Sequence, residues 1–221
     1  MPRTKYLTVE GIYDKTFYDS LLPKLGINDV EVIIPNNSGI AYNGKGNAID
    51  LFASSLLSLC SGSINKLALI IDSDFSEISS EGFNNTLKAV IKKTYGKGFD
   101  LKTTPANYNN GIKLKNDSCE QNAALWIMPD NKSDGYLEYL LFNALNLVKN
   151  SITSEVKNII GKIKTKEYPV HHEMKAMLAI AMAMFENPGR NISHLIDKDI
   201  LDYKNNESLR IFITFLCDYF R

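Results

Sequence analysis

Residues 66–75, KLALIIDSDF, constrain the fold of this chain more than any other segment. The run 67–71 is entirely apolar, so a strand formed there is apolar on both of its faces. Strands of this kind are typical of parallel sheets that are covered by helices on both sides. The run ends in two carboxylates, Asp72 and Asp74. The segment therefore predicts a deeply buried strand with charged residues at its carboxyl end.

Strand-like and helix-like segments alternate through the first half of the chain. Apolar or β-branched runs predict strands at 5–10, 30–35 and 66–74. Apolar residues at helical spacing predict helices at 14–25, 47–60 and 80–96. This rhythm predicts an α/β fold with a doubly wound, mostly parallel sheet.

The second half of the chain is predicted to complete the sheet and then to become helical. Edge strands are expected at 99–105 and 111–115, followed by a strand at 123–131 and a helix at 135–145. Three more helices are expected at 151–163, 171–185 and 207–220. We therefore expect one compact domain, with an α/β core over residues 1–150 and a helical extension over 151–221 packed on it.

Composition sets broad limits on the class of protein. The 221 residues carry 25 Lys and Arg against 25 Asp and Glu, and this balance neither indicates nor excludes a nucleic-acid partner. The three cysteines, Cys60, Cys119 and Cys217, are far apart and are expected to be reduced thiols. No apolar run approaches the ~18 residues of a membrane span, and no leader sequence is recognised. We expect a cytoplasmic protein with no membrane partner.

Acidic residues follow two of the predicted strands. Asp72 and Asp74 alternate with Ser73, so we expect both to point to one face at the carboxyl end of their strand. Glu10 ends the first strand and Asp14 follows four residues later. Open α/β sheets bind ligands at this edge. If the two strands are neighbours, four carboxylates converge there, and such oxygen ligands suit Mg²⁺ or Mn²⁺.

A structural explanation competes with the metal site. Asp is common after an apolar strand because it caps helices and begins turns. A single Asp-x-Asp pattern is therefore weak evidence. Two acidic pairs, both at strand ends in a βαβ setting, favour the metal site.

Two segments resemble the Toprim domain. The pattern is TVEGIYD at 8–14 followed by LALIIDSDF at 67–75. Toprim domains, found in topoisomerases, bacterial primases and OLD-family nucleases, carry a Glu-Gly after the first strand and an Asp-x-Asp after the third. Glu10 and the Asp72–Asp74 pair match these positions, and Asp14 matches a second acid of the OLD-type nucleases. Gly82 follows the aspartates later than a glycine does in many Toprim domains.

A closer resemblance lies further along the chain. Residues 125–141, LWIMPDNKSDGYLEYLL, and 174–189 resemble segments of a small prokaryotic Toprim group of unknown function. The resemblance implies a compact fold with a Mg²⁺-dependent role in cutting or joining phosphodiesters. It also favours metal-site roles for Asp130 and Glu138, which otherwise fit a capped turn, and a catalytic role for Lys175, which otherwise fits a solvated helix.

Several lysines are candidates for phosphate contacts. Gly39, Gly44 and Lys45 fit a P-loop, but Gly46 stands where that motif needs Ser or Thr, so ATP binding is not expected. Lys45 remains a candidate phosphate contact. Lys88 and Lys92 are helical neighbours that fit either a phosphate-binding patch or a solvated face.

The acidic residues together with the Toprim resemblance imply a Mg²⁺- or Mn²⁺-dependent phosphodiesterase, and we expect a nuclease acting on DNA or RNA. OLD-type relatives carry an ATPase module, so any ATP control would need a separate partner. Two alternatives stay open. One is a non-catalytic or partner-dependent Toprim module that binds nucleic acid or a protein, and the other is a hydrolase of a small phosphoester.

Overall fold

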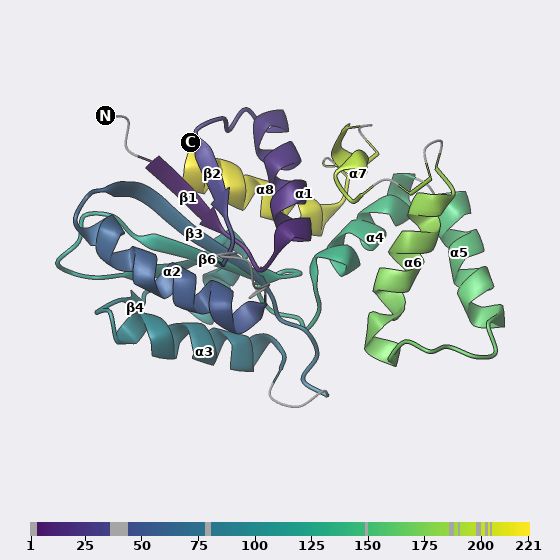
Figure 1. Cartoon of the computed structure of the whole chain (residues 1–221), viewed down its shortest axis with the longest axis horizontal. Helices are drawn as coiled ribbons and strands as arrows, with labels where there is room; N and C mark the ends of the chain where they lie inside the picture. The colour runs from purple at the N-terminus through teal and green to yellow at the C-terminus, as the bar shows by residue number, and fades with distance from the viewer. Residues whose placement is uncertain are drawn as a thin grey trace.

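Helices cover both faces of a single sheet (Figure 1). The computed structural model describes residues 4–35, 44–77, 81–148, 150–185, 188–189, 191–197, 200–201, 203 and 205–221. The six strands lie in the order β2-β1-β3-β6-β5-β4. Their bounds are β1 Thr4–Thr8, β2 Val30–Ile33, β3 Ile64–Asp72, β4 Asp100–Leu101, β5 Ile112–Lys115 and β6 Ala123–Met128.

The sheet is mostly parallel. Strands β2, β1, β3 and β6 pair in parallel, and β5 and β4 extend the β6 edge in antiparallel pairing. The chain moves outward from β1 to β2 and then returns to β3 on the other side of β1, so its winding direction reverses between β1 and β3. The predicted α/β class and doubly wound sheet are confirmed.

The predicted helices are present, together with short helical turns that the sequence did not indicate. Their bounds are α1 Ile12–Lys24, α2 Lys45–Cys60, α3 Phe83–Tyr95, α4 Leu137–Val148, α5 Asn150–Lys162, α6 Glu173–Ala183, α7 His194–Asp197 and α8 Glu207–Phe220, with 3-10 turns η1 Pro105–Asn110 and η2 Val170–His172. Within the described part of the chain, no helix is long and apolar enough to cross a membrane.

The two faces of the sheet bury separate apolar clusters. In β3, Ala68 and Ile70 join the cluster with α1, α4 and α8, whereas Leu67, Leu69 and Ile71 join the cluster with α2 and α3. Side chains alternate across a strand, so an uninterrupted apolar run supplies both layers. This alternation also assigns Asp72, one residue after Ile71, to the α1 face of the sheet.

The C-terminal helices occupy two places. Helix α8 packs on the sheet, where the ring centroid of Trp126 lies 5.2 Å from Phe212 and 5.0 Å from Phe215. Helices α5 and α6 pack on α4 and on each other and lie beside the carboxyl edge of the strands (Figure 1). We call α4, α5 and α6 the helical lobe. The edge of the sheet and the lobe face each other across the region where the acidic residues lie.

The expected state of two cysteines is wrong. Cys60 at the end of α2 and Cys119 after β5 form a disulfide, with their Cα atoms 4.9 Å apart. The two residues are separated by 59 positions in the sequence, and it is the packing of α2 against the sheet that brings them together. Cys217 is a free thiol.

Candidate functional site

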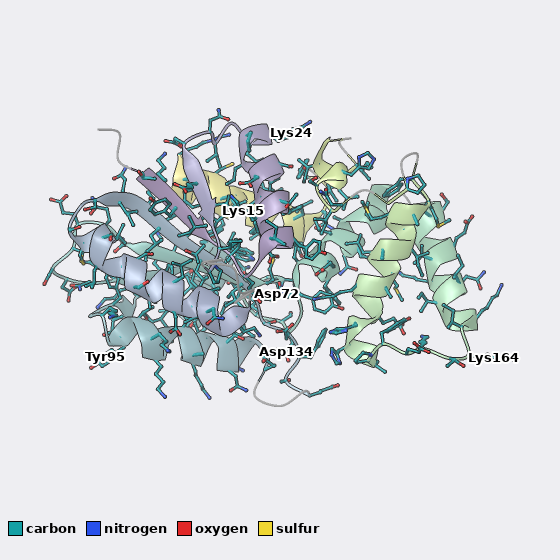
Figure 2. All side chains as sticks on the ribbon, viewed as in Figure 1. Lys15, Lys24, Asp72, Tyr95, Asp134 and Lys164 are labelled. Atoms are coloured by element: carbon teal, nitrogen blue, oxygen red, sulfur yellow. A yellow bond between two sulfur atoms is a disulfide. The ribbon has the colours of Figure 1, made fainter. Side chains whose placement is uncertain are left out.

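Glu10 and Asp72 meet at the switch point of the sheet. Strands β1 and β3 are parallel neighbours, with Thr8 opposite Leu69, so the residues that follow them lie side by side. The backbone N–H of Asp72 donates to Glu10 Oε1 at 2.8 Å. Figure 2 shows Asp72 in the middle of the molecule, between the sheet and the helical lobe. The adjacency of the first and third strands, on which convergence depends, is therefore present.

Asp14 approaches from the first turn of α1. Gly11 precedes the helix, and its N–H donates to Asp14 Oδ2 at 3.2 Å. This local contact resembles half of a capping box and holds the carboxylate beside the turn that carries Glu10. Asp14 therefore makes the helix-capping contact that was the alternative to metal binding. The same carboxylate also lies where a metal ligand was predicted.

The amino end of α4 faces the same crevice. The N–H of Leu137, the first residue of α4, donates to Asp72 Oδ1 at 3.0 Å. Helix amino ends favour negative charge because their N–H groups are unpaired within the helix. Glu138 in the same turn adds a further carboxylate, and its charge acts on both Asp14 and Asp72. We call Glu10, Asp14, Asp72 and Glu138 the carboxylate cluster.

Burial and mutual repulsion perturb the cluster. Burial raises the pKa of Glu10 from 4.5 to about 7, with the charges of Asp14 and Asp74 acting in the same direction. Burial and the charge of Glu138 raise the pKa of Asp14 from 3.8 to about 6. Burial raises the pKa of Asp72 far above its usual range, and Glu10, Asp14 and Glu138 add to this. The folded protein holds these acids at a free-energy cost.

A buried tyrosine hydroxyl without a hydrogen-bond partner among the described residues is influenced by the charges of the carboxylate cluster. Tyr18 is on α1, one turn after Asp14, and its side chain is 1% exposed. Its hydroxyl is buried and makes no hydrogen bond within the described structure. After burial, the charges of Asp14, Asp72 and Glu138 are what raise the pKa of Tyr18. Tyr18 was not among the residues predicted from sequence, although its spacing of four from Asp14 places both on one helical face.

Asp74 departs from the predicted arrangement. It has a left-handed φ of 57° and forms an isolated bridge with Gly135, its N–H donating to the Gly135 carbonyl at 2.8 Å. The strand ends at Asp72, so strand alternation no longer applies two residues later. Asp74 Oδ2 instead pairs with the Lys45 ammonium at 2.6 Å. Asp72 and Asp74 therefore contact different partners, from α4 and α2 respectively.

Lys45 joins several acceptors at the start of α2. Besides Asp74, it pairs with Glu81 and donates to the Ser73 carbonyl at 3.1 Å. Its position next to Asp74 fits the candidate phosphate contact, but its ammonium is already neutralised by two carboxylates. Glu81 is an acid that the sequence analysis did not select. Gly39 of the P-loop-like pattern lies outside the described residues.

Helix α6 of the helical lobe contributes a cation that acts on the carboxylate cluster. Lys175 Nζ of α6 lies 4.5 Å from the ring centroid of Tyr136, and its charge acts on Asp14 and Asp72. His172 lies in the neighbouring η2 turn, and its pKa is lowered by burial and by the charges of His171 and Lys175, against smaller opposing effects of Asp74 and Glu138. Tyr136 donates its hydroxyl to the His171 carbonyl at 2.7 Å and so fixes this turn.

Asp130 and Asn131 are placed away from the carboxylate cluster. Asp130 accepts the N–H groups of Lys132 and Ser133 at 3.1 and 2.7 Å, and it lines a hollow with residues of α8. Asn131 is buried, accepts the Ile127 N–H at 2.6 Å and has a left-handed φ of 61°. The turn explanation accounts for both contacts.

Lys88 and Lys92 lie on the solvent side of α3. The side chains of both lysines are exposed to solvent. Their neighbour Lys93 pairs with Asp50 of α2 at 2.6 Å. The arrangement places these lysines on a solvated helical face.

The donors suit a hard divalent cation, although they are not arranged as a closed ligand set. Within the described ranges, no group of three or more His, Cys, Asp or Glu side chains is positioned to hold a metal ion. One oxygen each of Glu10, Asp14 and Asp72 accepts a backbone N–H. Oxygen donors, excess negative charge and the unpartnered Tyr18 hydroxyl nevertheless fit Mg²⁺ or Mn²⁺ better than a soft metal.

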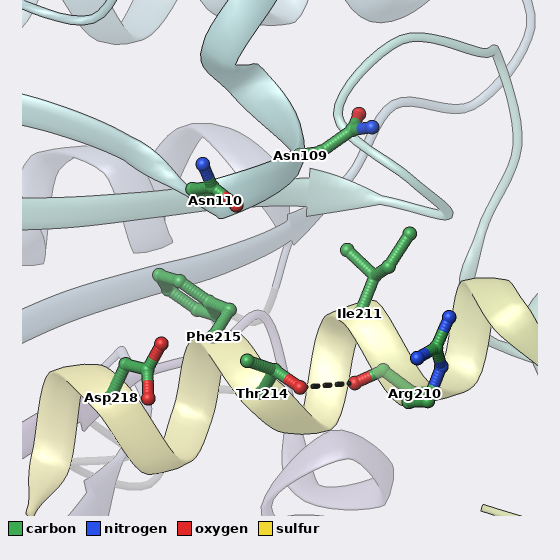
Figure 3. A pocket seen from close by; sticks show the side chains of 7 residues that line it. All are labelled: Asn109, Asn110, Arg210, Ile211, Thr214, Phe215 and Asp218. Carbon is green, nitrogen blue, oxygen red and sulfur yellow. Dashed lines mark hydrogen bonds between the residues drawn. The ribbon is translucent and has the colours of Figure 1, made fainter. Parts of the chain in front are cut away.

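A second hollow, of about 260 Å³, lies between α8 and the η1–β5 segment (Figure 3). It is lined by Asn109, Asn110, Arg210, Ile211, Thr214, Phe215 and Asp218. It shares no residue with the carboxylate cluster. Arg210 and Asp218 stand more than one helical turn apart along α8, and the hollow offers no converging set of acids.

The fold and the crevice define a class: a doubly wound α/β protein with an acidic site at its switch point. More particularly, the chain belongs to the family described as "Protein of unknown function (DUF3226)", whose model matches residues 4–221. Searches of curated proteins and of solved structures gave no match. The Toprim resemblance is not shown by these comparisons and stays a hypothesis.

Proposed function

We propose that the crevice is the active site of a Mg²⁺- or Mn²⁺-dependent phosphodiesterase, a nuclease acting on DNA or RNA. The observation that carries the proposal is the convergence of Glu10, Asp72 and Asp14 from separate elements at the switch point. Ligands of open α/β sheets bind at this point. The buried, unpartnered Tyr18 hydroxyl beside these acids is a second observation that favours a bound ligand.

Glu10, Asp14 and Asp72 would hold the metal, with Glu138 assisting from α4. Asp74 and Glu81 would join them only on release from Lys45, which pairs with both. A bound divalent ion supplies an activated water and neutralises charge on the leaving oxygen. The reaction consumes one water and converts a phosphodiester into a phosphomonoester and a free hydroxyl.

The residues around the carboxylate cluster have defined roles in this proposal. Lys175 faces the cluster from α6 and would offset negative charge on the phosphate in the transition state. The Tyr18 hydroxyl would donate a hydrogen bond to an oxygen in the crevice. Backbone N–H groups of Asp72 and Leu137 keep Glu10 and Asp72 in fixed orientations.

A non-catalytic binding module is the second candidate. It is favoured by a specific observation: Lys45 already neutralises Asp74 and Glu81, and no closed ligand set is present among the described residues. In that case the site would bind a divalent ion or a phosphate without turnover, and a partner protein would supply the missing groups. A hydrolase of small phosphoesters would differ from a nuclease in the weak salt dependence of its substrate binding.

The test is a cleavage assay on plasmid, single-stranded DNA and structured RNA, with Mg²⁺ or Mn²⁺. Asp72→Asn is expected to abolish cleavage, whereas Asp100→Asn, an exposed acid on β4, is the matched control and should not. Asp130→Asn should also retain cleavage, because its carboxylate serves its own turn. Metal-dependent cleavage that survives in Asp72→Asn would refute the assignment. Mn²⁺ binding without cleavage would favour the binding module.

A further inference from the structure

An apolar cleft opens beside the carboxylate cluster. It has a volume of about 390 Å³ and lies between the first turn of α1, helix α6 and the residues Gly189, Asn191 and Ile192. Leu178, Ala179 and Met182 of α6 supply apolar surface. Glu138 and Lys175 line the cleft and also act on the acids of the site, so the two regions are continuous. Whatever occupies the cleft lies next to the proposed reaction centre.

The ring of Tyr13 lines the outer side of this cleft. Its side chain is 79% exposed, the highest value among the exposed aromatic residues of the described chain. Tyr13 immediately precedes Asp14 in the first turn of α1. Tyr13 and Asp14 are thus joined by one peptide bond, so a group stacked on the Tyr13 ring lies close to the carboxylate cluster.

We propose that this cleft binds an unpaired nucleobase of the substrate, next to the phosphodiester at the carboxylate cluster. The inference rests on the proposed function and deepens it. A nucleobase has apolar faces and a polar edge, and the cleft offers an aromatic ring and aliphatic side chains together with polar groups from Glu138, Lys175 and Asn191. Stacking of bases on aromatic rings is the usual way in which proteins hold single strands.

The proposal selects a substrate class. A base inside a duplex is covered on both faces by its neighbours, so it reaches such a cleft only when the strand is single or the nucleotide is splayed out. Single-stranded DNA or RNA, or an unpaired end, is therefore the expected substrate. Stacking needs the ring of Tyr13 and makes no use of its hydroxyl.

The experiment measures binding separately from cleavage. Short single-stranded oligonucleotides with 2-aminopurine at one position are titrated with protein in Ca²⁺, and the fluorescence reports stacking of that base. The set comprises the wild type, Tyr13→Ala, Tyr13→Phe and the matched control Tyr95→Ala, an exposed tyrosine on α3. Duplex and abasic oligonucleotides of the same length are titrated in parallel, and thermal unfolding verifies that each variant is folded.

We expect Tyr13→Ala to weaken single-strand binding about tenfold, as for loss of one stacked base. Tyr13→Phe and Tyr95→Ala should bind the single strand as the wild type does. The wild type should bind duplex or abasic strands only as weakly as Tyr13→Ala binds the single strand. Equal binding by Tyr13→Ala, or equal binding of duplex and single strand, would overturn the inference. If the true occupant of the cleft is an apolar side chain of a partner protein, Tyr13→Ala should bind single strands as the wild type does. The fluorescence of 2-aminopurine should then not change on binding.

The two proposals fail differently. If Asp72→Asn loses metal-dependent cleavage but Tyr13→Ala binds single strands normally, the base-binding inference is wrong and the phosphodiesterase stands. If the fluorescence responds as expected while no variant cleaves any substrate, the cleft binds a base and the catalytic proposal is wrong.

Discussion

Replacing Glu10 with Gln is expected to stabilise the metal-free protein while abolishing its metal binding. Burial raises the pKa of Glu10 from 4.5 to about 7. At about 1.36 kcal/mol per pKa unit, ionising this group in the folded state costs roughly 3 kcal/mol relative to the unfolded chain. Glutamine keeps an oxygen that can accept the Asp72 N–H, so the contact at 2.8 Å is retained without the charge.

The sign of the pH dependence follows from the direction of the change in pKa. The folded pKa of Glu10 lies above its unfolded value, so the folded state binds more protons between pH 4.5 and about 7. The contribution of Glu10 to stability is therefore lost as the pH rises through this window. Glu10→Gln should match the wild type near pH 4.5 and exceed it by roughly 3 kcal/mol at pH 8.

Urea unfolding from pH 4.5 to pH 8, with and without Mn²⁺, is the assay. Glu31→Gln, an exposed glutamate on β2, is the matched control and should follow the wild type throughout. Saturating Mn²⁺ should reverse the order, because an ion at about a thousand times its dissociation constant stabilises the wild type by roughly 4.1 kcal/mol, which exceeds the gain from removing the Glu10 charge. A Glu10→Gln protein that is less stable than the wild type at pH 8 without metal would refute the reasoning.

Three further predictions concern other parts of the molecule. Lys45→Met should tighten Mn²⁺ binding in calorimetry, because an ammonium 2.6 Å from Asp74 Oδ2 competes with a cation for that oxygen. An unchanged affinity would mean that Asp74 is not a ligand of the metal. Reducing the Cys60–Cys119 disulfide should lower the free energy of unfolding by about 2–4 kcal/mol in urea titrations, and an unchanged midpoint would contradict this. Phe212→Ala should cost about 3–5 kcal/mol by the same measurement, because Phe212 is fully buried against Trp126. A loss below about 1 kcal/mol would mean that α8 is not part of the core.

The sheet could be predicted from sequence because its signals are local. A run such as 67–71 is long enough and apolar enough to require burial on both faces, and this requirement does not depend on its neighbours. The place of Glu10 at the end of the first strand is local in the same sense. The adjacency of β1 and β3, on which the meeting of Glu10 and Asp72 depends, could only be assumed. Strand order depends on the topology of the whole sheet and not on any one segment.

The position of Asp74 could not be predicted because distant residues determine it. Its left-handed backbone is held by paired N–H···O contacts with Gly135, 61 residues later in the chain. The same long-range cause explains the Cys60–Cys119 pairing, which depends on where α2 packs. Tyr18 could not be selected from sequence either, because only the fold brings the charges of Asp72 and Glu138 close enough to act on its hydroxyl.

The arrangement of the acids is costly for folding, and this cost is itself an argument for function. Burial and neighbouring charges raise the pKa values of Asp14 and Asp72, and a capping contact alone does not require this, since Asp134, which is also only partly exposed, caps α3 and has a lowered pKa. Asp134 accepts the N–H of Phe83 at 2.7 Å, so this helix is capped by a carboxylate whose charged form is stabilised. The carboxylate cluster instead gathers repelling charges from β1, β3, α1 and α4. Such clusters are concentrated at functional sites, where a cation or substrate offsets the repulsion.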